Sequence, residues 1–144
     1  RRIVRVLIAC AACMALAAGC EGAPAESDLA GREWTLIGWY EGITCALPAV
    51  EDTEVTLQFL PDEGLVRGWT GCNAYGGPYQ IDGDGIEIEE LEVTEEACPN
   101  ETMAAQQEMY LDTLQQAESF SIEDDGRLRV ESGNRGLVFG RQDQ

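Results

Sequence analysis

The sequence predicts a mainly β fold in which a curled antiparallel sheet carries one packed helix. Short runs with alternating apolar residues recur between residues 34 and 139, and turn sequences rich in Gly, Asp and Asn separate them. A single stretch, which begins after Pro99, has helical spacing instead. Consecutive short strands with tight turns favour a sheet that curls towards a barrel.

The expected strands follow one another along the chain. They are residues 34–40, 54–59, 65–70, 79–81, 86–89 with an extension at 91–94, 120–122, 128–130 and 137–139. Asp82-Gly83-Asp84-Gly85 joins two of them as a hairpin turn. Residues 41–53 have no clear period, which predicts a loop. The barrel interior should take these apolar side chains: Val55, Leu57, Phe59, Ile86, Ile88, Leu128, Val130, Leu137 and Phe139.

The one expected helix starts at Asn100, which can serve as its N-cap, with Glu101 in the first turn. Its apolar stripe consists of Met103, Tyr110, Leu114 and Ala117, with Leu111 beside them. Its opposite, polar face carries Gln106, Glu108, Asp112 and Gln115. This pattern favours a helix that lies on the sheet over one that binds a partner.

The first residues have the layout of a secretory signal peptide, which we place at residues 1–19. Three arginines (Arg1, Arg2 and Arg5) precede an apolar run from Val6 to Ala18. This run is too short to span a bilayer, which needs about 20 residues.

Leu16-Ala17-Ala18-Gly19-Cys20 resembles a bacterial lipobox, in which a peptidase cuts before the Cys and its thiol carries a lipid. We therefore expect lipidation at Cys20 and a chain anchored on the extracytoplasmic side of a bacterial envelope, periplasmic or at the cell surface. A flexible tether of small and polar residues should occupy 20–31, with the folded domain at 32–141.

The charge is strongly acidic. The formal net charge is −18, and loss of the leader leaves six Arg against 27 Asp and Glu, a charge of −21. Nucleic-acid binding depends on Lys and Arg that neutralise phosphates, so we exclude nucleic acid as a partner.

The residues for common catalysis are missing from the sequence. It has no His, which excludes Ser-His-Asp and Cys-His nucleophile systems and His metal ligands. Asp82-Gly83-Asp84-Gly85 resembles the start of a calcium-binding loop, but the residues that such a loop needs at its later positions are missing. The carboxylates of 87–96 fit a solvated face. We therefore expect that the protein is not an enzyme and binds no cofactor or metal. We also expect a monomer that contacts the membrane through its lipid anchor.

Three cysteines remain after the leader and Cys20: Cys45, Cys72 and Cys98. The Cys10-x-x-Cys13 pair is part of the leader and would be removed with it. We pair Cys72 with Cys98, a bond that would join the end of the third strand to the start of the helix, in a compartment where disulfides persist. Spacing alone leaves a Cys45–Cys72 bond open.

Residues 68–79, GWTGCNAYGGPY, closely resemble the signature of the META domain (HslJ-like) family. The matching positions are Gly68, Gly71, Cys72, Asn73, Tyr75, Gly77 and Tyr79, and the later Thr94 and Cys98 match its T-x-x-x-C element. Glu96 stands where the family often has Met. The resemblance implies a cracked, lipocalin-like barrel with a helix packed on it, in an envelope lipoprotein without known enzymatic activity.

The same signature residues have structural interpretations. The glycines allow close backbone approach or positive φ, and Asn73 can hydrogen-bond turn backbone. Tyr75 and Tyr79 can place their rings over a barrel end and their hydroxyls in water. A binding role for these Tyr and Asn side chains is the alternative.

Two functions follow. The first is a non-catalytic interaction or stress-related module that engages an envelope protein. The second is a carrier or sensor of an apolar ligand, such as an acyl chain, because secretin pilot lipoproteins of similar fold hold a lipid in the barrel. A core packed solid by Trp34, Phe59, Tyr110 and Phe139 would favour the first, and an open apolar cavity the second.

Overall fold

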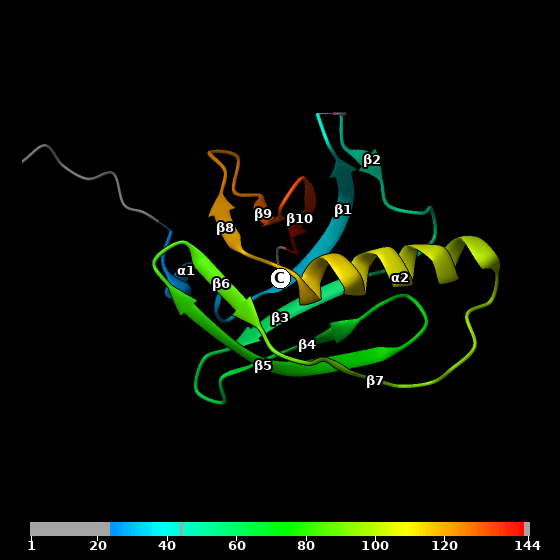
Figure 1. The fold of residues 1–144 in the computed structure, drawn as a ribbon, viewed down its shortest axis with the longest axis horizontal. Helices are drawn as coiled ribbons and strands as arrows, with labels where there is room; N and C mark the ends of the chain where they lie inside the picture. Colours follow the sequence, from blue (N-terminus) through cyan, green and yellow to red (C-terminus); the bar gives the residue numbers. More distant parts are fainter. Residues whose placement is uncertain (1–23, 44, 143–144) are drawn as a thin grey trace, which may run out of the picture.

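The computed structural model describes residues 24–43 and 45–142. The predicted signal peptide and Cys20 lie outside the described residues. The elements, in chain order, are α1 (Glu26–Leu29), β1 (Glu33–Glu41), β2 (Leu47–Pro48), β3 (Thr56–Leu60), β4 (Leu65–Trp69), β5 (Ala74–Asp82), β6 (Gly85–Ile88), β7 (Glu92–Val93), α2 (Glu101–Gln115), β8 (Ser119–Ile122), β9 (Leu128–Ser132) and β10 (Arg135–Arg141) (Figure 1). None of the described helices is both long and apolar enough to cross a membrane.

Eight antiparallel strands close into a barrel, in the order β10-β9-β8-β6-β5-β4-β3-β1. Pairing of β1 with β10, from Trp34↔Arg141 to Glu41↔Arg135, closes the ring. The contact between β6 and β8 is short, with one register pair at Gly85↔Ser119. The predicted mainly β fold, with one main helix on a barrel, is confirmed.

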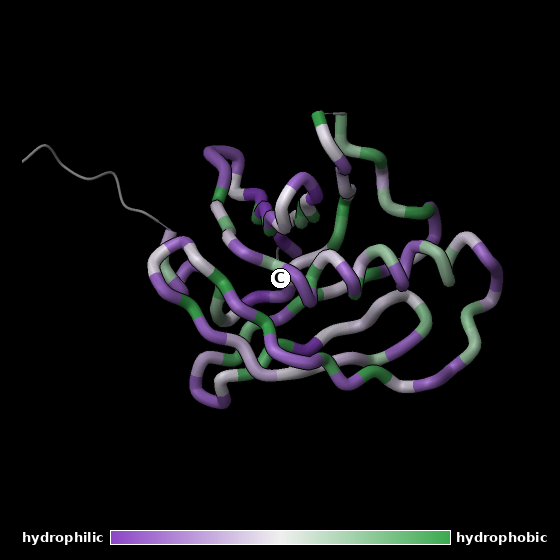
Figure 2. The backbone as a smooth tube through the Cα atoms, in the orientation of Figure 1, coloured by the Kyte–Doolittle hydropathy of each residue, from purple (hydrophilic) through white to green (hydrophobic). Residues whose placement is uncertain are grey.

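The barrel interior is filled by apolar side chains. All the residues that the sequence placed inside are buried, and Trp34, Tyr110 and Phe139 are completely inaccessible to solvent. Figure 2 shows the complementary pattern, with hydrophilic segments at the β3–β4 and β8–β9 turns. The alternation of strand residues therefore decides which side chains enter the core.

Strand β5 is longer than the sequence predicted. It starts at Ala74 and includes Pro78, and residues 74–78 pair with Trp69 to Leu65 of β4. Gly76, Gly77 and Pro78 have low strand propensity and break the alternation. Pairing with a neighbouring strand outweighs this local preference. A short strand, β2, also occurs in the predicted loop 41–53.

The tether prediction is wrong for its last residues, 26–31. Glu26–Leu29 form the short helix α1, and the side chain of Leu29 is fully buried. The indole Nε1 of Trp34 donates a hydrogen bond to the Leu29 carbonyl over 3.2 Å, and Ala30 forms a bridge with Phe59. The folded domain therefore begins before Arg32.

Helix α2 lies between the β8–β10 part of the barrel and the β3–β5 part (Figure 1), and contacts β6, β9 and β10. Its start is as predicted, because the Asn100 side chain accepts a hydrogen bond from the Met103 N–H over 2.9 Å. Tyr110 and Leu114 are buried as expected. The assignment of Gln106 to the polar face is wrong, because this side chain is buried.

Candidate functional site

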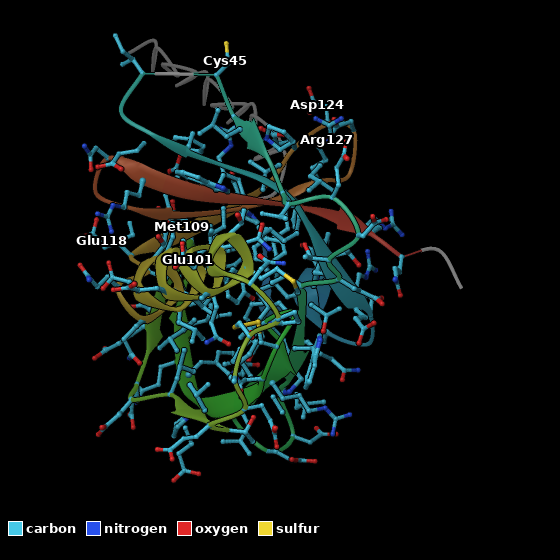
Figure 3. The ribbon with its side chains drawn as sticks, turned by 90° about the vertical axis from the view of Figure 1, so that its right-hand side faces the viewer. Cys45, Glu101, Met109, Glu118, Asp124 and Arg127 are labelled. Carbon is cyan, nitrogen blue, oxygen red and sulfur yellow. A yellow bond between two sulfur atoms is a disulfide. The ribbon has the colours of Figure 1, made fainter. Side chains whose placement is uncertain are left out.

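A disulfide joins Cys72 to Cys98, as predicted, with Cα atoms 5.1 Å apart. It links the turn after β4 to the segment that leads into α2. Cys45 is exposed and free, so the alternative Cys45–Cys72 bond does not form. Figure 3 shows Cys45 at the outer end of its loop, away from α2.

Asn73 is the centre of a hydrogen-bonded cluster that includes the next signature element. Its Nδ2 donates to the Glu96 carbonyl over 3.0 Å and to Gln107 Oε1 over 2.9 Å. Its Oδ1 accepts from Thr94 Oγ1 over 2.9 Å and from the Glu96 N–H over 2.6 Å. Its backbone N–H donates to Thr70 Oγ1. Since the buried amide uses both its donor and its acceptor capacity within the protein, Asn73 is a structural residue.

Other amides of α2 hold two further segments in place. Gln106 Oε1 accepts from the Val50 N–H over 2.7 Å, and Gln106 Nε2 donates to Thr53 Oγ1 over 3.0 Å. Gln115 makes three hydrogen bonds of 2.7–2.9 Å with the backbone of residues 88–91. Sequence reasoning could not find these contacts, because an isolated Gln on a helix is normally solvated.

Tyr75 does not place its hydroxyl in water, contrary to the prediction. The hydroxyl donates to the Thr56 carbonyl over 2.7 Å and lies 2.6 Å from the Tyr110 hydroxyl oxygen. Burial raises the pKa of Tyr75 well above its ordinary value of 10.0, and the neighbouring Tyr110 raises it further. Burial also raises the pKa of Tyr110. Both tyrosine hydroxyls therefore stay protonated, and this neutral pair joins α2 to the barrel.

Tyr79 is also largely buried, with its ring packed edge-on against Phe59 at a centroid distance of 5.3 Å. Its hydroxyl donates to Glu26 Oε1 over 2.7 Å, which fixes α1 to β5. Burial, followed by the contact with this carboxylate, raises the pKa of Tyr79. Its hydroxyl is thus bound to protein, where the sequence analysis expected water.

Two signature glycines are required by the backbone. A Cβ at Gly68 would lie 2.0 Å from the Thr56 carbonyl oxygen, so strands β3 and β4 could not keep this spacing with a side chain there. Gly71 has φ of 98°, a value that other residues rarely adopt. The signature residues from Gly68 to Tyr79, together with Thr94 and Cys98, thus build the scaffold.

The described residues contain no group of three or more His, Cys, Asp or Glu arranged to hold a metal ion. Asp82 pairs with Gly85 at the β5–β6 turn, as a hairpin requires.

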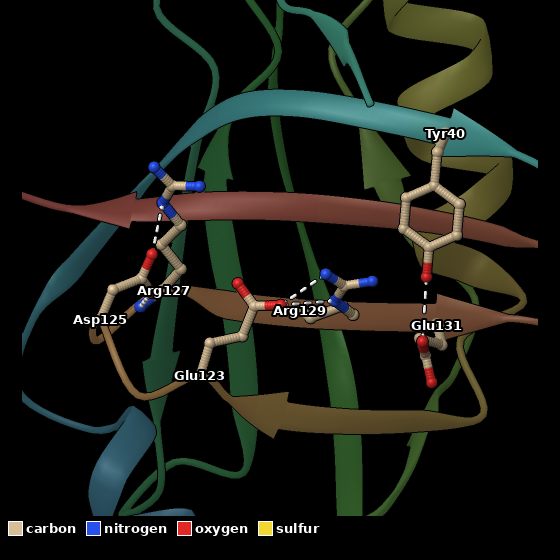
Figure 4. Close-up of polar contacts among 6 residues, drawn as sticks. All are labelled: Tyr40, Glu123, Asp125, Arg127, Arg129 and Glu131. Carbon is tan, nitrogen blue, oxygen red and sulfur yellow. Dashed lines mark hydrogen bonds and ion pairs between the residues drawn. The ribbon is translucent and has the colours of Figure 1, made fainter. Parts of the chain in front are cut away.

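Most of the basic side chains on the β8–β10 side pair with acids of the same chain. Figure 4 shows Arg129 beside Glu123 and Arg127 beside Asp125.

The outer face of β4 and β5 is hollowed by a groove of about 700 Å³. Its lining includes Arg67, the small residues Ala74 and Gly76, and the apolar residues Leu65 and Pro78. Sequence reasoning missed this groove, because it forms between the β3–β4 turn and a distant segment, residues 90–94. It lies outside the filled barrel core.

Comparison with known proteins agrees with the described architecture. A model of the META domain matches residues 27–144. An NMR structure of a protein from Burkholderia xenovorans has a TM-score of 0.65 and 20% identity, covering 81% of this chain and 85% of that chain. A crystal structure of a DUF4847 family protein from Bacteroides vulgatus has a TM-score of 0.60 and 16% identity, covering 82% and 99%. At these identities the structures show a shared fold. No curated protein matches.

Proposed function

Because the chain belongs to the META domain family, we propose that it is a non-catalytic, lipid-anchored envelope domain that engages a protein partner through its outer surface. Lipid attachment would be at Cys20, with the chain on the extracytoplasmic side of a bacterial envelope. The lipobox-like end of the leader supports this placement, and the Cys72–Cys98 bond suits an oxidising compartment.

The filled interior is the observation that carries the proposal. Trp34, Phe59, Tyr110 and Phe139 are each at most 1% exposed and occupy the barrel core. Protein interiors packed this way leave few voids larger than a water molecule. An acyl-chain carrier would need an apolar cavity in that space. Recognition at the outer surface therefore explains the architecture better than the alternative, a carrier or sensor of an apolar ligand.

Other observations support the non-catalytic part of the proposal. The sequence has no His, and the groups with raised pKa include Tyr75 and Tyr110, which are buried in structural contacts. A catalytic acid or base needs a shifted pKa together with access to substrate. The carboxylates that line the outer groove are exposed, and exposed groups of this kind favour charge recognition over acid–base chemistry.

Photo-crosslinking in intact cells of the native host tests the proposal. A photoreactive amino acid would replace Arg67, on the outer face of β4, or Glu108, on the exposed face of α2. We expect a discrete crosslinked protein from at least one position, dependent on an intact Cys20. A fatty-acid label should be lost in Cys20→Ser. A chain that carries the fatty-acid label but forms no protein crosslink would contradict the proposed protein partner. A wild-type chain without the fatty-acid label would contradict the proposed lipid anchor.

A further inference from the structure

The outer groove runs along strands β4 and β5. Its lining extends over residues 74–78 of β5, which at the usual strand rise span about 15 Å. Leu60, Leu65 and Pro78 provide apolar surface, while Gly76 contributes no side chain and keeps the floor low. A groove of this size and shape fits an extended segment of a few residues better than it fits a compact metabolite.

Three carboxylates stand at the groove: Glu63 on the β3–β4 turn, and Glu90 and Glu92 on the opposite side. All three are exposed. None of them makes an ion pair in residues 24–43 and 45–142. The groove therefore combines apolar surface and the cation Arg67 with negatively charged sides formed by Glu63, Glu90 and Glu92.

The basic residues of the domain do not neutralise these sides. Arg67, the cation in the groove, directs its Nε to Gln58 Oε1 over 3.0 Å. Arg135 pairs with Asp112 over 2.7 Å, and the β8–β9 arginines pair with their own neighbours. The hydrogen bond to the neutral Gln58 amide leaves the charge of Arg67 in place, so the groove has one positive charge against three carboxylates and its net charge is negative.

An exposed aromatic side chain lies next to the groove. Trp69 is 42% exposed and lines a second hollow of about 340 Å³, which shares Arg67 and Ala74 with the first. Glu33 lines the same hollow. Trp is enriched among the residues that dominate binding energy at protein interfaces. The two hollows together therefore provide an exposed aromatic side chain and exposed carboxylates.

We propose that this groove binds an extended segment of a partner protein in which Lys or Arg side chains alternate with apolar ones. The apolar side chains of the segment contact Leu60, Leu65 and Pro78, and its cations lie against Glu63, Glu90 and Glu92. This inference rests on the proposed function, since it names the surface and the chemistry of the partner. Alternation suits the site because neighbouring side chains of an extended segment point to opposite sides.

A defined peptide tests the groove. The probe is a seven-residue peptide of alternating lysine and valine, titrated at physiological salt into the mature chain carrying Cys20→Ser and followed by backbone NMR. A peptide with glutamate in place of lysine is the matched probe. We expect shifts confined to β4, β5 and residues 90–94 with the lysine peptide, and none with the glutamate peptide. No shift with either peptide, or shifts spread over the surface, would overturn the proposal.

Paired variants separate specific from general charge attraction. Glu63→Gln, Glu90→Gln and Glu92→Gln together should weaken peptide binding on the order of ten-fold, the sum of three exposed pairs. The control combines Glu51→Gln, Glu108→Gln and Asp124→Asn, which remove the same charge from exposed positions outside the groove. Equal weakening by both sets would overturn the proposal.

A steric variant completes the test. Ala74 is exposed and faces the groove, so Ala74→Trp should fill it and abolish the peptide shifts while the remaining spectrum stays folded. If that variant still binds the peptide at the same residues, the groove assignment is wrong. If it no longer binds the peptide but captures the same cellular partner, the groove proposal fails for that partner while the proposed function stands.

Discussion

The side-chain nitrogen of Asn73 lies 2.9 Å from Oε1 of Gln107 and donates a hydrogen bond to it. This contact joins the turn after β4 to helix α2, and the Cys72–Cys98 bond lies beside it in the chain. Tyr75, two residues further along, joins the same helix through Tyr110. These residues of the family signature therefore connect the barrel to the helix, and we propose that recognition uses the outer surface instead.

Reduction of the disulfide should destabilise the domain strongly. The bond closes a loop with a sequence separation of 26, for which the chain-entropy model gives about 3.5 kcal/mol. Urea unfolding of the double variant Cys72→Ala and Cys98→Ala should show a loss of about this size. Cys45→Ser is the control and should leave the midpoint unchanged, because Cys45 is exposed and unpaired. A double variant as stable as the control would contradict this role of the bond.

Alkaline pH should unfold the domain through its tyrosines. The pKa values of Tyr40, Tyr75, Tyr79 and Tyr110 are all raised above the ordinary 10.0, with burial as the largest cause in each. A raised folded-state pKa stabilises the fold below the unfolded value, so this stability is lost as the pH rises above 10. For the fully buried Tyr75 and Tyr110 the loss should approach about 1.4 kcal/mol per pH unit each, and Tyr40 and Tyr79 should contribute less because solvent screens them more.

The chain has no Lys and no His. Titration of these side chains therefore does not contribute to the alkaline pH dependence. Urea midpoints at pH 8 to 11.5 should fall steeply for the wild type and less steeply for the double variant Tyr75→Phe and Tyr110→Phe. Equal slopes for the two proteins would show that this buried pair does not carry the dependence.

The two buried hydroxyls should also be coupled energetically at neutral pH. The Tyr75 hydroxyl lies 2.6 Å from that of Tyr110 and 2.7 Å from the Thr56 carbonyl. Each single change to Phe should cost about 1–3 kcal/mol, because a buried polar group loses its partner. The double change should cost less than the sum of the two. Strict additivity in the double-mutant cycle would contradict the coupling.

Native mass spectrometry should find the folded chain without a bound lipid. The chain carrying Cys20→Ser, purified from envelopes without strong detergent, should appear at its own mass, because Trp34, Phe59 and Phe139 fill the barrel. A co-purified acyl ligand in a fixed ratio, displaced by Val130→Trp inside the barrel, would support the carrier function instead.

The sequence predicted the parts of this fold that depend on local pattern. Alternation identified strands such as β3, with Leu57 and Phe59 inward, and the N-cap at Asn100 identified the start of α2. For the cysteines, the sequence analysis favoured the Cys72–Cys98 bond but left a Cys45–Cys72 bond open, and the structure decides between them. The strands and the helix start need only one to four neighbouring residues to be recognised.

The features that the sequence analysis missed depend on residues far apart in the chain. Gln106 is buried because the loop at residues 50–53 brings a donor and an acceptor to it, which no helical pattern can show. Leu29 is buried because Trp34 and Phe59 lie next to α1. The outer groove likewise requires residues 90–94 to lie across from the β3–β4 turn.

The free energy of unfolding of Asn73→Ala tests the central claim, that the signature builds the scaffold, most directly. The change removes four side-chain hydrogen bonds of 2.6–3.0 Å, and we expect a loss of about 3 kcal/mol in urea. Asn134→Ala, in an exposed turn, should stay within about 0.5 kcal/mol of the wild type. An Asn73→Ala protein as stable as the wild type, but unable to crosslink its partner, would contradict the account and make Asn73 a binding residue.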